Sequence, residues 1–249
     1  MDKNNLSEGS MLKDYFKKLY TGSQQEFCEL AANAMDQGQR MFIITANPET
    51  MMIGDSNEGM DQALCSPEST IVPDGIGVVK AAEQLGKTMH GRVTGVELSA
   101  YLINHVGTTG KSVYFYGAKQ EVLDALIAKV KADYPEINIV GSHNGYGNCD
   151  DQVFEEIVSL QPDLVLVALG IPRQEILINK YLDKFSKGIF IGVGGSFDVL
   201  SGTKKRAPAI FCKLNLEWLY RIMKEPKRFS RFFKSNVRFI SKIRKIKSL

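Results

Sequence analysis

The chain alternates between short apolar runs and longer segments with helical spacing. Six runs rich in Val, Ile, Leu and Phe have the length of β-strands, and they lie at residues 41–47, 70–73, 112–117, 137–142, 163–169 and 188–193. Several of them are continuously apolar, as in DLVLVAL at residues 163–169. Continuous runs are typical of strands that are buried on both faces of a parallel sheet.

Segments of helical length separate these runs, at residues 48–60, 76–86, 94–106, 119–133, 150–160 and 173–185. In the fourth segment, Val122, Leu126 and Val130 recur at four-residue steps. Strands that alternate with helices predict an α/β fold with a doubly wound, mainly parallel sheet.

The end of the chain has a different pattern. Apolar side chains recur there at three- and four-residue steps among Lys and Arg, namely Phe229, Phe233, Val237, Ile240 and Ile243. This spacing predicts an amphipathic helix with a cationic surround. We therefore expect an α/β domain at residues 1–202 and a basic helical appendage at residues 203–249, with a hinge at residues 202–205.

Charge follows the same division. Residues 203–249 hold 15 Lys and Arg against 2 Glu, a balance of +13, whereas residues 1–202 hold 16 basic and 26 acidic side chains, a balance of −10. An acidic body with a basic tail indicates an anionic partner. Apart from this segregation, the 249 residues are 44% apolar and 24% charged, which is ordinary for a globular protein.

Several classes of protein are excluded. The longest apolar run has eight residues, at 164–171, whereas about 18–20 are needed to span a bilayer. The first ten residues are polar, unlike a secretory signal. The four cysteines form no CxxC pair, which predicts buried free thiols, and the three histidines share no metal-ligand spacing. Because Asp-x-Asp and complete nucleotide fingerprints are also missing, we expect neither a metal nor another cofactor.

Glycine and small polar residues cluster where the predicted strands end. Asn47 and Asp74 follow the first two strands, and a glycine-rich stretch at residues 192–198 follows the last. In doubly wound folds, ligands bind beyond the carboxyl ends of the strands, and glycine there lets the backbone approach a ligand closely. Tight turns explain part of this glycine content, while the polar side chains beside it favour a polar ligand.

Asp74 is the candidate general base. It directly follows an apolar strand, where a partly desolvated carboxylate can face a cleft and accept a proton. The alternative is that Asp74 caps the helix that follows it. Two further readings also stay open at this point: Arg92 clamps phosphate or pairs with a surface acid, and Gln174 with Glu175 bonds sugar hydroxyls or caps a helix.

A series of motifs resembles the WecG/TagA/CpsF glycosyltransferases in content and order. They are TANPE at residues 45–49, PDGIGV at 73–78, RVTG at 92–95, GIPRQE at 170–175, GVGGSFD at 192–198, GTKKRAP at 202–208 and LEWLYR at 216–221. The resemblance covers about residues 20–235. Glu97, Arg173 and Ala46 depart mildly from the family pattern, and the first 20 residues look shorter than the family's N-terminal strand.

The resemblance implies an inverting transfer of N-acetylmannosamine from UDP-N-acetylmannosamine to N-acetylglucosamine on a polyprenyl-diphosphate lipid. Such a step belongs to the assembly of teichoic acid or another cell-surface polysaccharide, in the cytoplasm at the inner face of the membrane. The residues alone leave open another donor (UDP-glucose or UDP-N-acetylmannosaminuronic acid) and nucleic-acid binding by the basic tail. Under the resemblance no nucleic acid is expected.

The resemblance also implies roles for individual side chains. The expected catalytic residues are the base Asp74 and four that orient sugar and acceptor, Thr45, Asn47, Arg92 and Gln174. The expected substrate-binding residues are Tyr146 and Asp198 on the uridine side, Glu175, and the arginines Arg206, Arg221, Arg228 and Arg231, of which the last three would close over the diphosphate.

The tail is expected to bind an anionic membrane surface, because the acceptor's lipid is embedded in a membrane. Lys and Arg attract anionic lipid and inserted Phe and Ile side chains add apolar contact, which suffices for peripheral attachment. The alternative is that the apolar stripe packs on the body or on a second subunit in a homo-oligomer.

Overall fold

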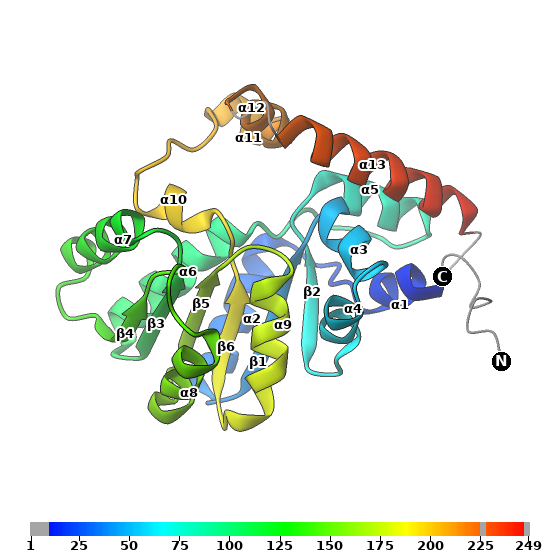
Figure 1. Ribbon diagram of the computed structural model, residues 1–249. Coiled ribbons are helices and arrows are strands. Elements are labelled where there is room, and N and C mark those ends of the chain that lie inside the picture. Colours follow the sequence, from blue (N-terminus) through cyan, green and yellow to red (C-terminus); the bar gives the residue numbers. More distant parts are fainter. Residues whose placement is uncertain (1–9, 225–227, 247–249) are drawn as a thin grey trace.

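A computed structural model describes residues 10–224 and 228–246, apart from the side chains of Ser10, Ala209, Lys213, Arg221, Arg228 and Arg231. Six parallel strands form one sheet in the order β2–β1–β6–β5–β3–β4 (Figure 1). They are β1 (Arg40–Ala46), β2 (Ser69–Pro73), β3 (Ser112–Gly117), β4 (Asn138–His143), β5 (Leu164–Ala168) and β6 (Gly188–Gly192). The α/β fold is confirmed, and each predicted strand is present with nearly the expected bounds.

Helices cover both faces of the sheet. One face carries α1 (Ser10–Lys18), α3 (Pro48–Gly54), α4 (Glu58–Cys65), α5 (Ile76–Gln84), α8 (Asp150–Leu160), α9 (Arg173–Tyr181) and α13 (Arg228–Lys245). The other face carries α2 (Gln24–Asp36), α6 (Gly95–Thr109), α7 (Gln120–Asp133) and α10 (Ser196–Leu200). The short helices η1 (Leu182–Lys184), α11 (Ala209–Lys213) and α12 (Glu217–Lys224) complete the described elements.

The carboxyl ends of β1 and β6 lie next to each other in the middle of the sheet. The helix after β1, α3, packs on one face, whereas the helix after β6, α10, packs on the other. Neighbouring strands whose following helices diverge in this way open a crevice at the carboxyl edge of a sheet. The residues that follow β1 and β6, among which we look for the site, lie at this edge of the sheet.

Three parts of the chain differ from the expected pattern. The predicted helix at residues 48–60 is two helices, because Asn57 starts α4 by accepting a hydrogen bond from the N–H of Met60 (2.9 Å). Helices α1 and α2 were not predicted, although Ser23 and Glu26 form the capping box that begins α2. Among the described residues of the N-terminal segment, α1 is followed by a single parallel bridge between Leu19 and Ile71.

Helix α13 packs on the body of the protein. After α10 the chain crosses to α11 and α12, and α13 then lies across α3 and α5 (Figure 1). Two of its buried side chains and the residue directly after it join the same core as α1 and the sheet, and we call them the inner side: Phe239, Ile243 and Ile246. Asp55, which is 7% exposed, pairs with Arg238 (3.0 Å) and Lys242 (2.6 Å) of this helix.

The apolar stripe predicted for α13 is divided between two surfaces. Ile243 belongs to the buried inner side, whereas the other four residues form an exposed outer stripe, Phe229, Phe233, Val237 and Ile240, at 56, 57, 50 and 48%. Packing on the body is thus confirmed for one side of the helix only. Among the residues described, no helix is long and apolar enough to cross a membrane.

The cysteines are all free, but the prediction that they are buried holds only for Cys28. Cys65 and Cys149 are exposed, and Cys212 is partly buried. Cys65 ends α4 and Cys149 precedes α8, so both lie at helix ends on the surface rather than in an apolar stripe.

We expect Phe239→Ala to lower the free energy of unfolding by about 3 kcal/mol, because it removes a buried aromatic side chain that packs on Phe16. Phe233→Ala, on the exposed side of the same helix, is the matched control and should change it by less than about 1 kcal/mol. Urea denaturation measures both. Equal effects of the two substitutions would contradict docking of α13 on the body.

Candidate active site

The carbonyl group of Ala46 joins β1 to the two residues that follow β2. The N–H groups of Asp74 and Gly75 both donate to the carbonyl oxygen of Ala46, at 2.9 and 3.2 Å. A Cβ atom at position 75 would lie only 3.0 Å from Cβ of Asn47, so glycine permits this close approach. The contact brings Thr45, Asn47 and Asp74 to one place, as their positions at strand ends predicted.

The carboxyl group of Asp74 points to the start of α6. Its Oδ1 accepts a hydrogen bond from the N–H of Gly95 (3.3 Å), the first residue of that helix. The N-cap position of α5 is occupied by Gly75 rather than by Asp74, whose Oδ1 bonds to α6 instead. The carboxyl group of Asp74 thus lies at the N-terminal end of α6, beside the ends of β1 and β2.

Thr45 lies near the end of β1, and Asn47 directly follows that strand. Thr45 Oγ1 donates to the carbonyl of Gly192 at the end of β6 (3.3 Å), and its Cγ2 lies 3.3 Å from where a Cβ of Gly95 would be. Asn47 begins α3, and its Oδ1 accepts from two backbone N–H groups at 2.8 and 3.1 Å. That cap uses only the amide oxygen, so the Nδ2 hydrogens take no part in it.

Arg92 joins Asp74 to the appendage. Its Nη1 donates to the carbonyl of Asp74 (3.4 Å), and its Nη2 lies 3.3 Å from Oε2 of Glu217 in α12. Both side chains are largely buried, at 16% and 13% exposure. This contact of Glu217 was not predicted, since a contact between residues 125 positions apart leaves no local spacing signal.

Arg206 extends this contact into a chain of alternating charges. It pairs with Glu97 of α6 (2.6 Å) and with Oε1 of Glu217 (3.5 Å). Burial opposes the charge of Arg206, but the hydrogen bond and the charge of Glu97 outweigh it and raise the pKa of the guanidinium. We call Arg92, Glu217, Arg206 and Glu97 the ion-pair chain, and it connects the body to the appendage beside the crevice.

The side chain of Gln174 lies inside the protein, at 2% exposure. Its Oε1 accepts from the N–H groups of Gly170 (3.0 Å) and Gly194 (3.1 Å), and its Nε2 donates to Oε1 of Glu175 (2.7 Å). The amide therefore ties the turn after β5 to the turn after β6. The expected contact of Gln174 with sugar or acceptor stays a prediction.

Glu175 is the most deeply buried acidic side chain of the described residues, at 1% exposure. Burial raises the pKa of its carboxyl group to about 7, against the effect of the Gln174 hydrogen bond. Its Oε2 is one of two buried side-chain polar atoms that have no hydrogen-bond partner in the described part of the chain. Glu175 was expected to bind substrate, and this stays a prediction. In the structure its Oε1 accepts the hydrogen bond from Gln174.

The residues expected on the uridine side lie at the other strand ends. Tyr146 is 66% exposed in the loop after β4, and the carbonyl of the neighbouring Gly145 accepts from Arg173 at the start of α9 (3.3 Å). Asp198 lies in α10 and pairs with Lys204 (3.3 Å). Both positions border the carboxyl edge of the sheet, and their contact with uridine stays a prediction.

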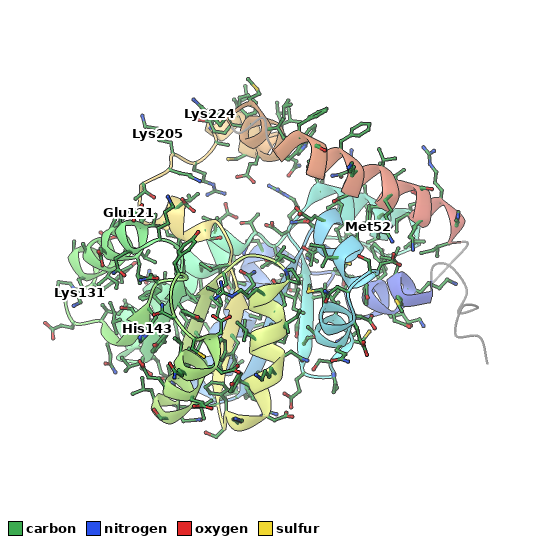
Figure 2. All side chains as sticks on the ribbon, viewed as in Figure 1. Met52, Glu121, Lys131, His143, Lys205 and Lys224 are labelled. Carbon is green, nitrogen blue, oxygen red and sulfur yellow. The ribbon has the colours of Figure 1, made fainter. Side chains whose placement is uncertain are left out.

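Three of the expected diphosphate-binding arginines lie outside the described side chains, namely Arg221, Arg228 and Arg231. Their backbones belong to α12 and α13. Figure 2 places the nearby Lys205 and Lys224 at the outer edge of the appendage, away from the sheet. Across residues 10–224 and 228–246, no three His, Cys, Asp or Glu side chains gather to hold a metal ion.

The glycosyl transferase WecG/TagA/CpsF family matches residues 17–248 of this sequence. The chain belongs to this family. The match runs through the body and the appendage together, and it confirms the resemblance carried by the strand-end motifs. As a WecG/TagA/CpsF protein, the chain is a glycosyltransferase.

Curated relatives within the WecG/TagA/CpsF family are similar over most of their length. A protein of Bacillus spizizenii is 41% identical over 202 residues, which cover 81% of this chain and 78% of the relative. A Bacillus subtilis protein is 37% identical over the same shares, and a Staphylococcus aureus protein is 38% identical over 83% and 81%. Each of the three relatives is named N-acetylglucosaminyldiphosphoundecaprenol N-acetyl-beta-D-mannosaminyltransferase.

We expect the stability of the protein to fall as the pH rises from 5 to 8, in part because of Glu175. Its folded pKa of about 7 lies above the ordinary value of 4.5, so the folded state keeps a proton that the unfolded state loses. The stabilisation is complete below the ordinary value and is lost as the pH passes through the folded pKa. A shift of this size corresponds to roughly 3 kcal/mol at most.

Urea denaturation of the wild type and of Glu175→Gln at several pH values measures this contribution. The glutamine variant cannot titrate, so its free energy of unfolding should gain on that of the wild type as the pH rises. A difference that stays constant between pH 5 and 8 would show that Glu175 does not titrate with a raised pKa.

Proposed function

We propose that this glycosyltransferase moves N-acetylmannosamine from UDP-N-acetylmannosamine to N-acetylglucosamine on a polyprenyl-diphosphate lipid, with inversion at the anomeric carbon. The observation that carries the proposal is the Asp74 carboxylate at the joined ends of β1 and β2, between Arg92 and the start of α6. The names of the relatives supply the sugar and the acceptor. The polymer would be a teichoic acid or another cell-surface polysaccharide.

In the proposed mechanism the acceptor hydroxyl loses its proton to Asp74 while its oxygen bonds to the anomeric carbon of the donor sugar. The bond from that carbon to UDP breaks on the opposite face, and UDP leaves with the electron pair. Thr45 and Asn47 flank Asp74 and would orient sugar and acceptor. General-base catalysis typically accelerates a reaction by about 10²- to 10⁴-fold.

The charge that develops on UDP requires cationic side chains, and the appendage brings them to the crevice. We place Arg92 and Arg206 near the diphosphate, because Arg92 contacts the carbonyl of Asp74 and shares Glu217 with Arg206. Arg221, Arg228 and Arg231 follow in α12 and α13 and would close over the same group. In this proposal residues 1–202 bind the nucleotide sugar and residues 203–249 complete the site.

We expect Asp74→Asn to lower kcat by about a hundredfold or more while the KM for UDP-N-acetylmannosamine changes less than about threefold, because the amide cannot accept the hydroxyl proton. Asp133→Asn, at an exposed aspartate that ends α7, is the matched control. UDP release with a lipid-linked N-acetylglucosamine acceptor measures both. Turnover of Asp74→Asn within about tenfold of the wild type would remove Asp74 as the base.

The same assay with UDP-glucose and UDP-N-acetylmannosaminuronic acid tests the donor. The proposed activity requires that UDP-N-acetylmannosamine has the highest kcat/KM of the three. Preference for either other donor would keep the glycosyltransferase assignment and overturn the proposed sugar.

We further propose that the outer side of the appendage rests on an anionic membrane surface at the cytoplasmic face. Eight of the thirteen exposed large apolar side chains in the described residues belong to the appendage: Ile210, Leu214, Trp218, Met223, Phe229, Phe233, Val237 and Ile240. Lys234 and Arg244 are exposed among them. A cationic helix with exposed Phe and Ile is suited to the interface of an anionic bilayer.

Phe233→Ser with Ile240→Ser should weaken binding to phosphatidylglycerol vesicles by about a hundredfold, since two inserted apolar side chains contribute about 1.5 kcal/mol or more each. Substitution suits this test better than deletion of the tail, because deletion would also remove the inner side of α13 from the core. Leu30→Ser with Leu160→Ser, at exposed leucines of α2 and α8, is the control. Vesicle flotation measures binding, and unchanged flotation of the α13 variant would exclude this surface.

A further inference from the structure

We propose that Glu175 is a positioning residue for glycosyl transfer, which acts by orienting the Gln174 amide that joins the glycine turns after β5 and β6. The proposal rests on the proposed transferase function for its consequence in turnover. Its structural part, the orientation of one amide group, is independent of which sugar is transferred. Glu175 would therefore serve the reaction without touching substrate.

The two side chains occupy space that a missing side chain leaves free. Phe190 of β6 packs in the core on the α9 face, so position 192 points to that face as well. Residue 192 is glycine, and a Cβ there would lie 2.6 Å from Nε2 of Gln174 and 2.8 Å from Oε1 of Glu175. The pair thus sits directly beneath the end of β6, in a cradle that any larger residue would fill.

Only one orientation of the Gln174 amide fits its neighbours. The oxygen faces two N–H donors, those of Gly170 and Gly194, and the nitrogen faces the carboxyl oxygen of Glu175. A flipped amide would set its NH₂ group against two donors and its oxygen against the Glu175 oxygen, which leaves buried polar groups unpaired. The Glu175 oxygen is the acceptor that selects the correct orientation from the nitrogen side.

The turns that this amide joins carry groups of the candidate site. The carbonyl of Gly192 accepts the hydroxyl of Thr45, and the turn at Gly194 leads into α10, which bears Asp198. The turn at Gly170 leads into α9. A small shift of either turn would move these side chains relative to Asp74, and transfer rates depend steeply on such alignment.

Stability does not account for a carboxyl group at this place. Its Oε2 is buried and has no partner among the residues described, and a buried unpaired polar atom costs free energy of folding. An apolar side chain of similar volume would avoid that cost. A positioning role explains why an acceptor is present there, and it separates the expected effects on turnover and on stability.

Two variants of nearly the same shape test the proposal in the full-length protein. Glu175→Met removes the acceptor and keeps the volume, whereas Glu175→Gln keeps an acceptor oxygen. For each we would measure kcat and KM in the UDP-release assay, the melting temperature, and the amide hydrogen exchange of Gly170 and Gly194 by NMR. The exchange measurement needs no donor or acceptor.

For Glu175→Met we expect kcat to fall by about tenfold or more with KM within about threefold, and an unchanged or higher melting temperature. The Gly170 and Gly194 amides should exchange at least about tenfold faster, because their shared acceptor is no longer held. Glu175→Gln should restore kcat to within about threefold of the wild type and restore protection of both amides.

Full turnover of Glu175→Met would overturn the proposal, as would equal impairment of both variants. A melting temperature that falls by about 10 °C or more in Glu175→Met would assign Glu175 a structural role instead. If the wild type released UDP from none of the donors, the proposed function would fail. The exchange rates would still show whether Glu175 orients the amide.

Discussion

The candidate site depends on the carbonyl oxygen of Ala46, which accepts the N–H groups of both Asp74 and Gly75. This bifurcated contact joins the end of β2 to the end of β1, and glycine suits position 75 because a Cβ there would lie 3.0 Å from Cβ of Asn47, closer than an ordinary contact. The parallel pairing of β1 with β2 already sets Ala46 opposite Pro73, and the contact continues it by two residues, to Asp74 and Gly75. Backbone geometry therefore brings together Asn47 and Asp74, two of the residues that we propose for the reaction.

The appendage contacts the body of the protein beside Asp74. Glu217 reaches Arg92 from α12, so a residue of the C-terminal segment supplies a partner to an arginine that contacts Asp74. Arg221 follows Glu217 by four residues, one turn of the same helix. The basic segment and the acidic body thus meet beside Asp74, where the proposed anionic leaving group would need positive charge.

The strands, and the shared edge at which the candidate residues lie, could be predicted because they follow from local properties of the sequence. Continuous apolar runs mark strands buried on both faces, and the polar residues that end them, such as Asn47 and Asp74, share one edge of a parallel sheet. Contacts between distant segments could not be predicted in this way. Neither the pairing of Glu217 with Arg92 nor the burial of Gln174 beneath β6 leaves a spacing pattern. For the same reason, the apolar stripe of α13 was predicted as one surface. In the structure Ile243 is buried in the core, whereas the other four residues of the stripe are exposed.

The divided stripe of α13 limits how far this helix can enter a lipid layer. Since Phe239, Ile243 and Ile246 are committed to the core, only the outer side chains can leave water, and they reach roughly 5–10 Å, into the headgroup region. On the membrane surface proposed for it, the protein would then lie at a nearly constant distance above the acyl chains. A lipid-linked sugar would have to extend out of the bilayer by that distance to meet Asp74. The distance between α13 and Asp74 would therefore set the length of head group that an acceptor needs.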